Sequence, residues 1–243
     1  MKLTVCGFGG AGCRIADRLV AADGDRGRSF VVDSVGIDTD QPDLSSLAAI
    51  PDDSRHLYGV IEAEGEGVDG DRSVGAAAAK NGATEITNAV DDAISSQADA
   101  ILCCVGLAGG SGATALPRVA DELRRVYDIP VYGLGILPAV ATPFDEGEPP
   151  ATARNTGRAL ADIATATDAL LLFDNELWLS SGDSASDPDT QADLNETLVT
   201  RLAALFAAGE GDHDRQIAER VVDASEVQNT FDAGGIAAIG YAS

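Results

Sequence analysis

The chain has 243 residues, of which 45% are hydrophobic, so it is long enough for one large α/β domain or for one domain and part of another. Its 40 acidic and 16 basic residues give a net charge of −24, which excludes a nucleic-acid-binding protein, because such proteins need a basic surface. The acidic residues are spread along the sequence, and we interpret them as an adaptation to a high-salt cytosol. No window is long and apolar enough to cross a membrane, so we expect a cytoplasmic protein without an integral membrane segment.

The first predicted unit is a strand over Lys2–Cys6, a glycine-rich loop over Gly7–Gly12 and a helix over Cys13–Ala22. The loop reads GFGGAG, which is the GxGxxG spacing of a dinucleotide fingerprint in the strand–loop–helix setting that it requires. A second strand, Phe30–Asp38, ends in an acidic segment. Its carboxylates could bind a ribose, hold a metal-bound water beside a phosphate, or cap the next helix.

The next stretch is predicted to be mostly irregular. Gln41–Leu57 resembles a loop, and the glycine-rich, acidic segment Tyr58–Arg72 is predicted to be a mobile surface loop. Its carboxylates lack the spacing of a calcium site, so we expect solvated charge there. Ser73–Gln97 has helical periodicity.

The central feature is the apolar run Ala100–Val105, which has the character of a strand buried on both faces of a parallel sheet. A loop with four glycines follows from Gly106, and then a helix is predicted over Ala115–Val126. Backbone N–H groups at such a helix N-terminus form a cradle for an anion, and the hydroxyls of Ser111 and Thr114 add donors. The loop has no lysine, so it is not a GxxxxGK[ST] phosphate loop. The alternative is a strand–helix turn that only requires glycine.

The remaining elements continue the alternation of strands, loops and helices. They are predicted as a strand over Asp128–Leu137, a loop over Pro138–Pro150, a helix over Ala151–Thr167, a strand over Ala169–Phe173, a polar loop over Ser180–Thr190, a long helix over Asp193–Ala208 and a strand over Gly234–Tyr241. The fold class is therefore α/β, an open parallel sheet of Rossmann-like type with helices on both faces. Both glycine-rich loops fall at the carboxyl edge of this sheet, where such folds bind ligands.

The four cysteines show no CxxC spacing and predict no disulfide framework. Cys103 and Cys104 are neighbours on the central strand and should point to opposite faces. We expect all four to be small buried hydrophobic residues, and we predict no metal site made of protein ligands.

The order of these motifs resembles that of the tubulin/FtsZ superfamily of self-assembling GTPases, in particular its archaeal CetZ branch. The segment GLAGGSGAT from Gly106 to Thr114 is similar to the family signature GGGTGSG, and Gly7–Gly12 is similar to its first phosphate loop. The segment Phe173-Asp174-Asn175 resembles a base-reading loop, and Val222–Thr230 resembles the catalytic loop that one subunit inserts into the nucleotide site of its neighbour.

The resemblance implies GTP or GDP as ligand, with Mg²⁺ reached through phosphate and water, and head-to-tail assembly into filaments. It implies Asp223 and Glu226 as catalytic acids. The implied nucleotide-binding residues are Gly9, Gly10, Ala11, Cys13, Asp38, Gly106, Ala108, Gly109, Gly110, Ser111, Gly112, Glu146, Asn155, Asn175 and Asn195. Asn175 and Asn195 supply amides that can both donate to and accept from guanine, whereas capping is the alternative role of the two acids.

The implied domains are a GTP-binding domain over 1–190, a core helix over 191–210, and a catalytic loop with the start of an apparently truncated second domain over 211–243. Two departures from the family pattern are Ala108 and Thr114, which replace glycines in the signature loop. An added methyl group there can block close approach of the backbone to a phosphate. A guanine-nucleotide-binding regulatory protein without turnover, and a Rossmann oxidoreductase that uses the first loop, are the alternative functions.

Overall fold

The computed structural model describes residues 1–25, 30–139, 150–179, 184, 187–207, 224–231 and 234–240. Its elements are β1 (Leu3–Phe8), α1 (Gly9–Asp25), β2 (Val31–Asp38), α2 (Gln41–Ser45), η1 (Asp52–Ser54), β3 (Arg55–Leu57), α3 (Val60–Ala63), α4 (Arg72–Asn81), α5 (Ala83–Ala93), β4 (Ala100–Gly106), α6 (Gly112–Val126), β5 (Val131–Leu137), α7 (Ala151–Ala166), β6 (Ala169–Asp174), α8 (Asn175–Trp178), α9 (Pro188–Phe206), α10 (Ala224–Phe231) and β7 (Gly235–Ala238). None of the helices in the described part of the chain is long and apolar enough to cross a membrane.

The described strands form one seven-stranded parallel sheet in the order β3-β2-β1-β4-β5-β6-β7, as in the predicted fold class. The order reverses beside β1, so the carboxyl ends of β1 and β4 lie next to each other at the switch point of the sheet. In α/β folds of this kind, such a switch point opens a crevice for a ligand. Both glycine-rich loops leave the sheet there.

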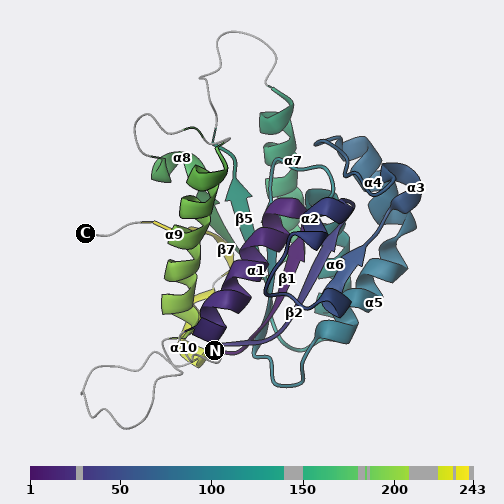
Figure 1. Cartoon of the computed structure of the whole chain (residues 1–243). Coiled ribbons are helices and arrows are strands. Elements are labelled where there is room, and N and C mark those ends of the chain that lie inside the picture. The colour runs from purple at the N-terminus through teal and green to yellow at the C-terminus, as the bar shows by residue number, and fades with distance from the viewer. Residues whose placement is uncertain are drawn as a thin grey trace, which may run out of the picture.

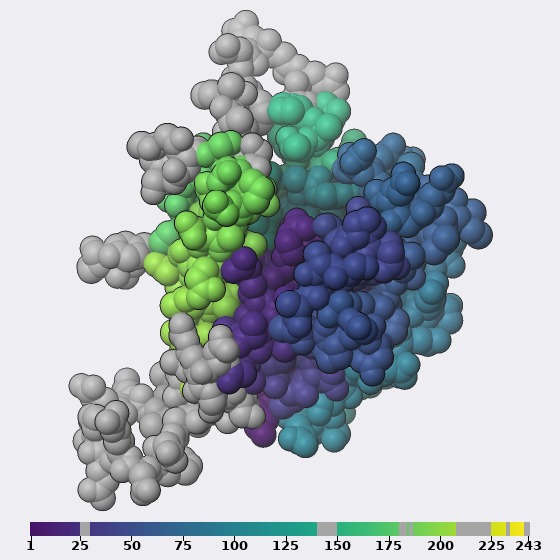
Figure 2. All heavy atoms as spheres, in the orientation of Figure 1, coloured from purple at the N-terminus to yellow at the C-terminus, as the bar shows by residue number. Residues whose placement is uncertain are grey.

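Helices cover both faces of the sheet (Figure 1). On one of these faces α9 lies beside α1 (Figures 1 and 2). The strand β4 contributes side chains to two hydrophobic cores, one on each face of the sheet. Leu102 and Cys104 pack into the cluster that contains α1 and α9 residues, whereas Ile101, Cys103 and Val105 pack into the cluster under α4, α5, α6 and α7. The predicted opposite orientation of the two neighbouring cysteines is therefore confirmed, and all four thiols are free and buried.

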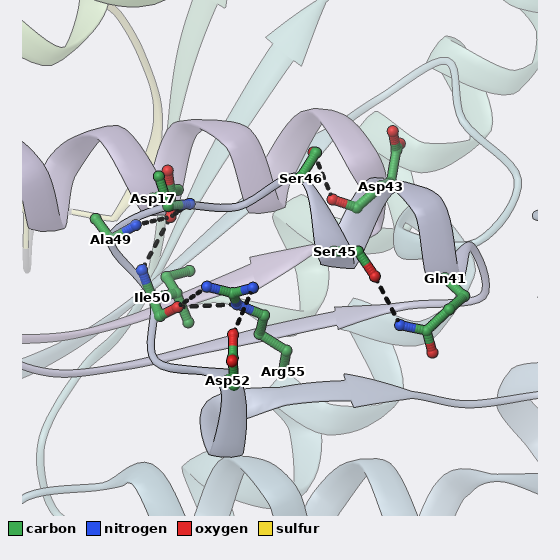
Figure 3. A network of polar contacts seen from close by, with 10 residues as sticks. Asp17, Gln41, Asp43, Ser45, Ser46, Ala49, Ile50, Asp52 and Arg55 are labelled. Carbon is green, nitrogen blue, oxygen red and sulfur yellow. Dashed lines mark hydrogen bonds and ion pairs between the residues drawn. The ribbon is translucent and has the colours of Figure 1, made fainter.

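The prediction of a loop over Gln41–Leu57 is wrong, because this stretch contains α2, η1 and β3. The reason is a set of contacts distant in sequence (Figure 3). Asp17 Oδ1 on α1 accepts three backbone N–H groups, from Ala48 at 3.0 Å, Ala49 at 2.7 Å and Ile50 at 2.9 Å. The guanidinium of Arg55 donates twice to Ile50 O, at 2.9 and 2.6 Å, and pins the turn that leads into β3.

The prediction of a mobile surface loop over Tyr58–Arg72 is wrong about its packing. The segment contains α3, and the side chains of Tyr58 and Val68 are buried. Two backbone hydrogen bonds tie it to the segment after β2, from Gly67 N to Thr39 O at 3.1 Å and from Gln41 N to Gly65 O at 2.8 Å. The segment is therefore part of the carboxyl edge of the sheet.

Element boundaries differ from the predictions at two informative places. The helical stretch Ser73–Gln97 is two helices, because it breaks at Gly82, which both ends α4 and precedes α5. The long helix begins at Pro188, five residues before its predicted start, because the Asp187 side chain accepts the N–H of Thr190 at 2.9 Å and caps it. Proline at the first helical position is compatible with such a start.

Candidate functional site

A pocket of about 440 Å³ opens at the carboxyl edge of the sheet. Its wall contains both glycine-rich loops, the ends of β2 and β6, the segment 66–70 and one face of α9. Of the predicted nucleotide-binding residues, those that line it are Gly9, Gly10, Ala11, Asp38, Gly106, Ala108, Gly109, Gly110, Ser111, Gly112, Asn175 and Asn195. Segments that are far apart in the sequence therefore meet around one cavity, which is large enough for a small-molecule ligand.

The middle of the pocket is built from two helix N-termini. The helix α1 begins at Gly9 and α6 begins at Gly112, and both residues line the cavity. Neither helix has an acidic residue in its first turn. The unpaired N–H groups and the positive ends of both helix dipoles are therefore directed at the same space, which suits a phosphate.

The two glycine-rich loops interlock, and the absence of side chains makes this possible. A Cβ atom on Gly112 would lie 2.2 Å from Phe8 O, and one on Gly12 would lie 2.1 Å from Cys104 O. Gly9 has a φ of +70°, which favours glycine for a second reason. The buried hydroxyls of Ser111 and Thr39 lie 2.6 Å apart and join the second loop to the segment after β2.

The two substitutions in the signature loop are accommodated. Ala108 does not have a positive φ, since Glu64 and Asp69 are the two non-glycine residues with one in the described part of the chain. The Thr114 hydroxyl donates within its own loop, at 2.7 Å from Gly110 O and 2.9 Å from Ser111 O, and Thr114 does not line the pocket. It therefore stabilises the loop instead of adding a donor for an anion.

One end of the pocket offers amide groups. Asn175 begins α8, and its Oδ1 is buried without a hydrogen-bond partner. Asn195 reaches the same cavity from α9, together with Gln191 and Leu194. A buried acceptor without a donor is unfavourable, so this end of the pocket suits a ligand that brings N–H groups. Gln191 was not predicted, although it lies one helical turn before Asn195 and hence on the same face.

The opposite end of the pocket, at β2 on the other side of β1 and β4 from β6, is acidic. Asp38, Asp40, Asp43, Glu66 and Asp69 line it, and Arg14 is the cation in the described lining. Asp40 caps α2 by accepting the N–H of Asp43 at 2.8 Å, as one of the predicted alternatives had it. Asp43 in turn forms an ion pair with Arg14 at 3.1 Å.

Asp38 has the most perturbed environment of these acids. It is 2% exposed, its Oδ1 accepts the N–H of Thr39 at 2.7 Å, and its Oδ2 is buried without a hydrogen-bond partner. Burial, together with the nearby charges of Asp43 and Asp40, raises the pKa of Asp38 from 3.8 to about 7, and the Thr39 hydrogen bond opposes this shift. A ligand or ion that supplies a donor or positive charge to Oδ2 would stabilise its ionised form.

We expect Asp38→Asn to stabilise the protein at pH 8 but not at pH 4. Between pH 3.8 and about 7 the folded chain retains a proton that the unfolded chain has released, so the unfolding free energy falls as pH rises through this window. The shift corresponds to at most roughly 4 kcal/mol, from which a missing acceptor for the new amide subtracts about 1 kcal/mol. Denaturant unfolding of variant and wild type in molar KCl measures the difference.

Asp33→Asn is the matched control for this experiment, because Asp33 is exposed on the same strand. At pH 8 its effect on stability should be much smaller than that of Asp38→Asn, because the Asp33 side chain is already exposed to water. A stability difference between Asp38→Asn and wild type that did not depend on pH would contradict the assigned environment of Asp38.

Several predicted residues lie elsewhere. The Cys13 thiol donates to Gly7 O at 3.4 Å and Ile37 O at 3.6 Å, behind the pocket wall, and burial raises its pKa. Asn155 is buried behind the wall as well. Glu146 and Asp223 lie outside the described residues. In the described part of the chain, no three His, Cys, Asp or Glu side chains are placed to hold a metal ion.

Glu226 lies at the other edge of the sheet. It is exposed in the first turn of α10, and Gln228 in the same helix donates to Asp99 O at 3.0 Å, just before β4 begins. Phe231 packs against Tyr132 near the start of β5, with ring centroids 5.1 Å apart. Figure 1 shows α10 beside the N-terminus, away from the pocket edge. Glu226 therefore cannot act in the pocket of its own chain.

These features define an α/β protein with an open parallel sheet and two glycine-rich, phosphate-type cradles at one switch point. Residues 2–183 match the family described as Tubulin/FtsZ family, GTPase domain, and residues 185–243 match Tubulin-like CetZ, C-terminal domain. The chain belongs to the tubulin/FtsZ family. This finding removes the support for a Rossmann oxidoreductase.

Relatives and solved structures agree with this assignment. The chain is 41% identical to CetZ5 of Haloferax volcanii over 244 residues, which is 100% of this chain and 60% of that protein. It is similar to a GDP-bound monomer of CetZ1 from the same organism, with a TM-score of 0.84 and 36% identity, over 97% of this chain and 66% of that one. It is also similar to the GTPγS-bound protofilament of CetZ2, with a TM-score of 0.84 and 38% identity, over 97% and 64%. The chain thus spans about 60% of the length of its CetZ relatives.

Proposed function

We propose that this chain binds guanine nucleotide in the pocket and hydrolyses GTP where a second copy, associated head to tail, completes the site. The observation that carries the proposal is the convergence of both glycine-rich loops with Asn175 and Asn195 on one cavity. A nucleotide placed there has its phosphates at the N-termini of α1 and α6 and its base against amides. The relatives described as GDP-bound and GTPγS-bound support this choice of ligand.

The position of Glu226 supports the head-to-tail part of the proposal. The pocket lies at the carboxyl edge of the sheet and α10 at the amino edge, so stacking two copies in the same orientation brings Glu226 of one toward the pocket of the next. Asp223 lies three residues earlier in the sequence. Repeated contacts of this heterologous kind build an open filament. The structure of a CetZ2 protofilament supports assembly of this type.

A magnesium ion fits the acidic end of the pocket. Asp38 Oδ2 is a buried acceptor without a partner, and it can accept a hydrogen bond from a metal-bound water. The described residues offer no complete set of metal ligands, so phosphate and water would supply the coordination. When bound, the ion neutralises negative charge on the phosphates. The carboxylates at this end would otherwise repel a triphosphate, because Arg14 is paired with Asp43.

The proposed organisation is a GTP-binding domain over 1–190, a core helix over 191–210, and a catalytic loop with the start of a second domain over 211–243. We place the protein in the cytoplasm, as a cytoskeletal element that acts in cell shape or division. A second candidate function is a guanine-nucleotide-binding protein without turnover. The location of Glu226 favours this candidate, because α10 lies at the edge of the sheet opposite the pocket. A single copy that does not associate with another therefore has no acid from α10 at its pocket.

We expect Asn175→Leu to weaken GDP binding roughly 10- to 100-fold, because leucine cannot pair with the N–H groups of guanine. The measurement is a titration with GDP followed by fluorescence. Trp178, the single tryptophan, stacks on Phe173 at 5.7 Å close to Asn175 and serves as the probe. ADP and NADH should bind weakly to the wild type.

Asn81→Leu is the matched control, because Asn81 is exposed and hydrogen-bonded to Glu62 at 2.6 Å away from the pocket lining. It should bind GDP as the wild type does. Tight binding of NADH that GDP does not displace would contradict the proposed ligand.

A further inference from the structure

The Asn155 side chain joins two walls of the pocket from behind. Its Nδ2 donates to Gly70 O at 2.8 Å and to Ala108 O at 3.0 Å. Two carbonyl acceptors fix the orientation of the amide, because only the NH₂ group can donate to both. Asn155 is 8% exposed and does not line the cavity. Its NH₂ group thus faces the backbone of the protein instead of a ligand.

The two carbonyls belong to different loops. Ala108 is in the second glycine-rich loop, and Gly70 ends the segment 66–70 at the acidic end of the pocket. That segment has an unusual backbone, with positive φ at Gly67, Asp69 and Gly70. For Asp69, a φ of 45° is strained and persists only if neighbouring contacts enforce it.

The helix α7 holds this segment at a second point. Asp162 lies seven residues after Asn155, which is two helical turns and therefore the same face. Its Oδ2 accepts a hydrogen bond from Arg72 at 3.0 Å. One face of α7 thus fixes both Gly70 and Arg72, on either side of the N-cap residue Asp71.

The order of groups along the pocket indicates which part of a ligand depends on the contacts that Asn155 and Asp162 make. In the strand order of the sheet, Asp38 ends β2, the glycine-rich loops follow β1 and β4, and Asn175 follows β6. The glycine-rich loops therefore lie between Asn175, which lines the pocket with Asn195, and Asp38, and segment 66–70 is hydrogen-bonded to the stretch after β2 through Gly67 N and Thr39 O. A nucleotide whose base contacts the asparagines extends its phosphates past the glycine-rich loops. Its last phosphate then lies nearest the segment that Asn155 holds, whereas a diphosphate depends on the glycine-rich loops alone.

We propose that Asn155 is a positioning residue that fixes the separation of segment 66–70 from the second glycine-rich loop, and so favours a nucleoside triphosphate over a diphosphate. The inference rests on the proposed function. The second glycine-rich loop retains other backbone hydrogen bonds without Asn155, from Leu107 N to Ile136 O at 3.0 Å and from Gly109 N to Gly106 O at 3.3 Å. The diphosphate site should therefore persist.

The test is the affinity of Asn155→Asp for GTPγS and for GDP, each titrated by Trp178 fluorescence with Mg²⁺ present. Aspartate keeps the size of the side chain but loses both donors and places a carboxylate against two carbonyl oxygens. We expect the affinity for GTPγS to fall about tenfold and that for GDP to change less than about twofold. Asn155→Ala should shift the ratio of the GTPγS affinity to the GDP affinity in the same direction. It replaces Asn155→Asp in the test if the aspartate variant does not fold.

Thr156→Ala is the matched control, because Thr156 donates to Thr152 O at 2.8 Å within the same helix. It should leave the ratio unchanged. An equal loss of affinity for both nucleotides in Asn155→Asp would overturn the proposal and indicate direct contact with the sugar or a general loosening of the site. An unchanged ratio with unchanged affinities would overturn it too. Failure of the wild type to bind either nucleotide would instead refute the proposed function.

Discussion

Replacing Gly112 with alanine should abolish nucleotide binding at micromolar concentrations. The added Cβ atom would lie 2.2 Å from Phe8 O, 2.4 Å from Phe8 C and 2.7 Å from Gly9 N. All three atoms are backbone, so no side chain can move aside, and the first loop has to shift. The shift separates the two helix N-termini that form the phosphate cradle.

We expect the affinity of Gly112→Ala for GDP to fall at least about 100-fold, because the backbone N–H groups at the two helix N-termini would no longer converge on the phosphates. The unfolding free energy should fall by roughly 1–3 kcal/mol, as for overpacking of other tight contacts. Fluorescence titration and denaturant unfolding measure the two quantities.

Gly157→Ala is the control, and its expected change in stability has the opposite sign. Gly157 lies within α7, and a Cβ atom there would meet nothing within 4 Å. The variant should gain about 0.5–1 kcal/mol in stability, because alanine favours the helix, and should bind GDP as the wild type does. If Gly112→Ala bound GDP and unfolded like Gly157→Ala, the interlocked arrangement of the loops would be wrong.

Replacing Asp223 with alanine should leave GDP binding unchanged and reduce GTP turnover roughly 100- to 10,000-fold, the usual contribution of a positioned carboxylate that orients or deprotonates a water. The steady-state rate of phosphate release measures this effect. Asp193→Ala, an exposed acid on α9, is the control and should keep the wild-type rate. The prediction follows from the position of Asp223 in the sequence and from the location of the neighbouring α10.

Mixing two inactive variants tests whether the acid acts in the next subunit. Asp223→Ala retains an intact pocket, and Asn175→Leu retains an intact catalytic loop. At a GTP concentration that does not saturate Asn175→Leu, each variant alone should be nearly inactive. An equimolar mixture should recover about one quarter of the wild-type rate, since one in four random head-to-tail junctions is intact. No recovery in mixed assemblies would contradict a composite site.

The sequence predicted the parts of the fold that depend on local patterns. Unbroken apolar runs such as Ala100–Val105 identified the buried strands, and glycine clusters after Phe8 and Val105 identified the edge where the pocket lies. Parallel topology then placed both loops together, because strands of such a sheet end at the same edge. Asn175 and Asn195 line this pocket, and their role in binding the base, which their resemblance to family motifs implies, stays a prediction.

The parts that the sequence did not predict depend on contacts between distant residues. The turn before β3 is held by Asp17, more than 30 residues earlier, and no pattern in the sequence near the turn indicates this contact. The segment 66–70 has the composition of a solvated loop, yet hydrogen bonds to Thr39 and Asn155 hold it against the pocket. Asn155 itself was predicted to bind the nucleotide, and its two carbonyl partners became evident only from the structure.

The most direct test of the proposed composite GTPase site is the rate of GTP hydrolysis per subunit as a function of protein concentration, measured in molar KCl with Mg²⁺. Salt at this concentration screens the net charge of −24 and allows copies to associate. We expect the rate per subunit to rise with concentration and to level off where sedimentation shows that most of the protein is assembled. A rate per subunit that stays constant over the same range would contradict a site completed by a second copy.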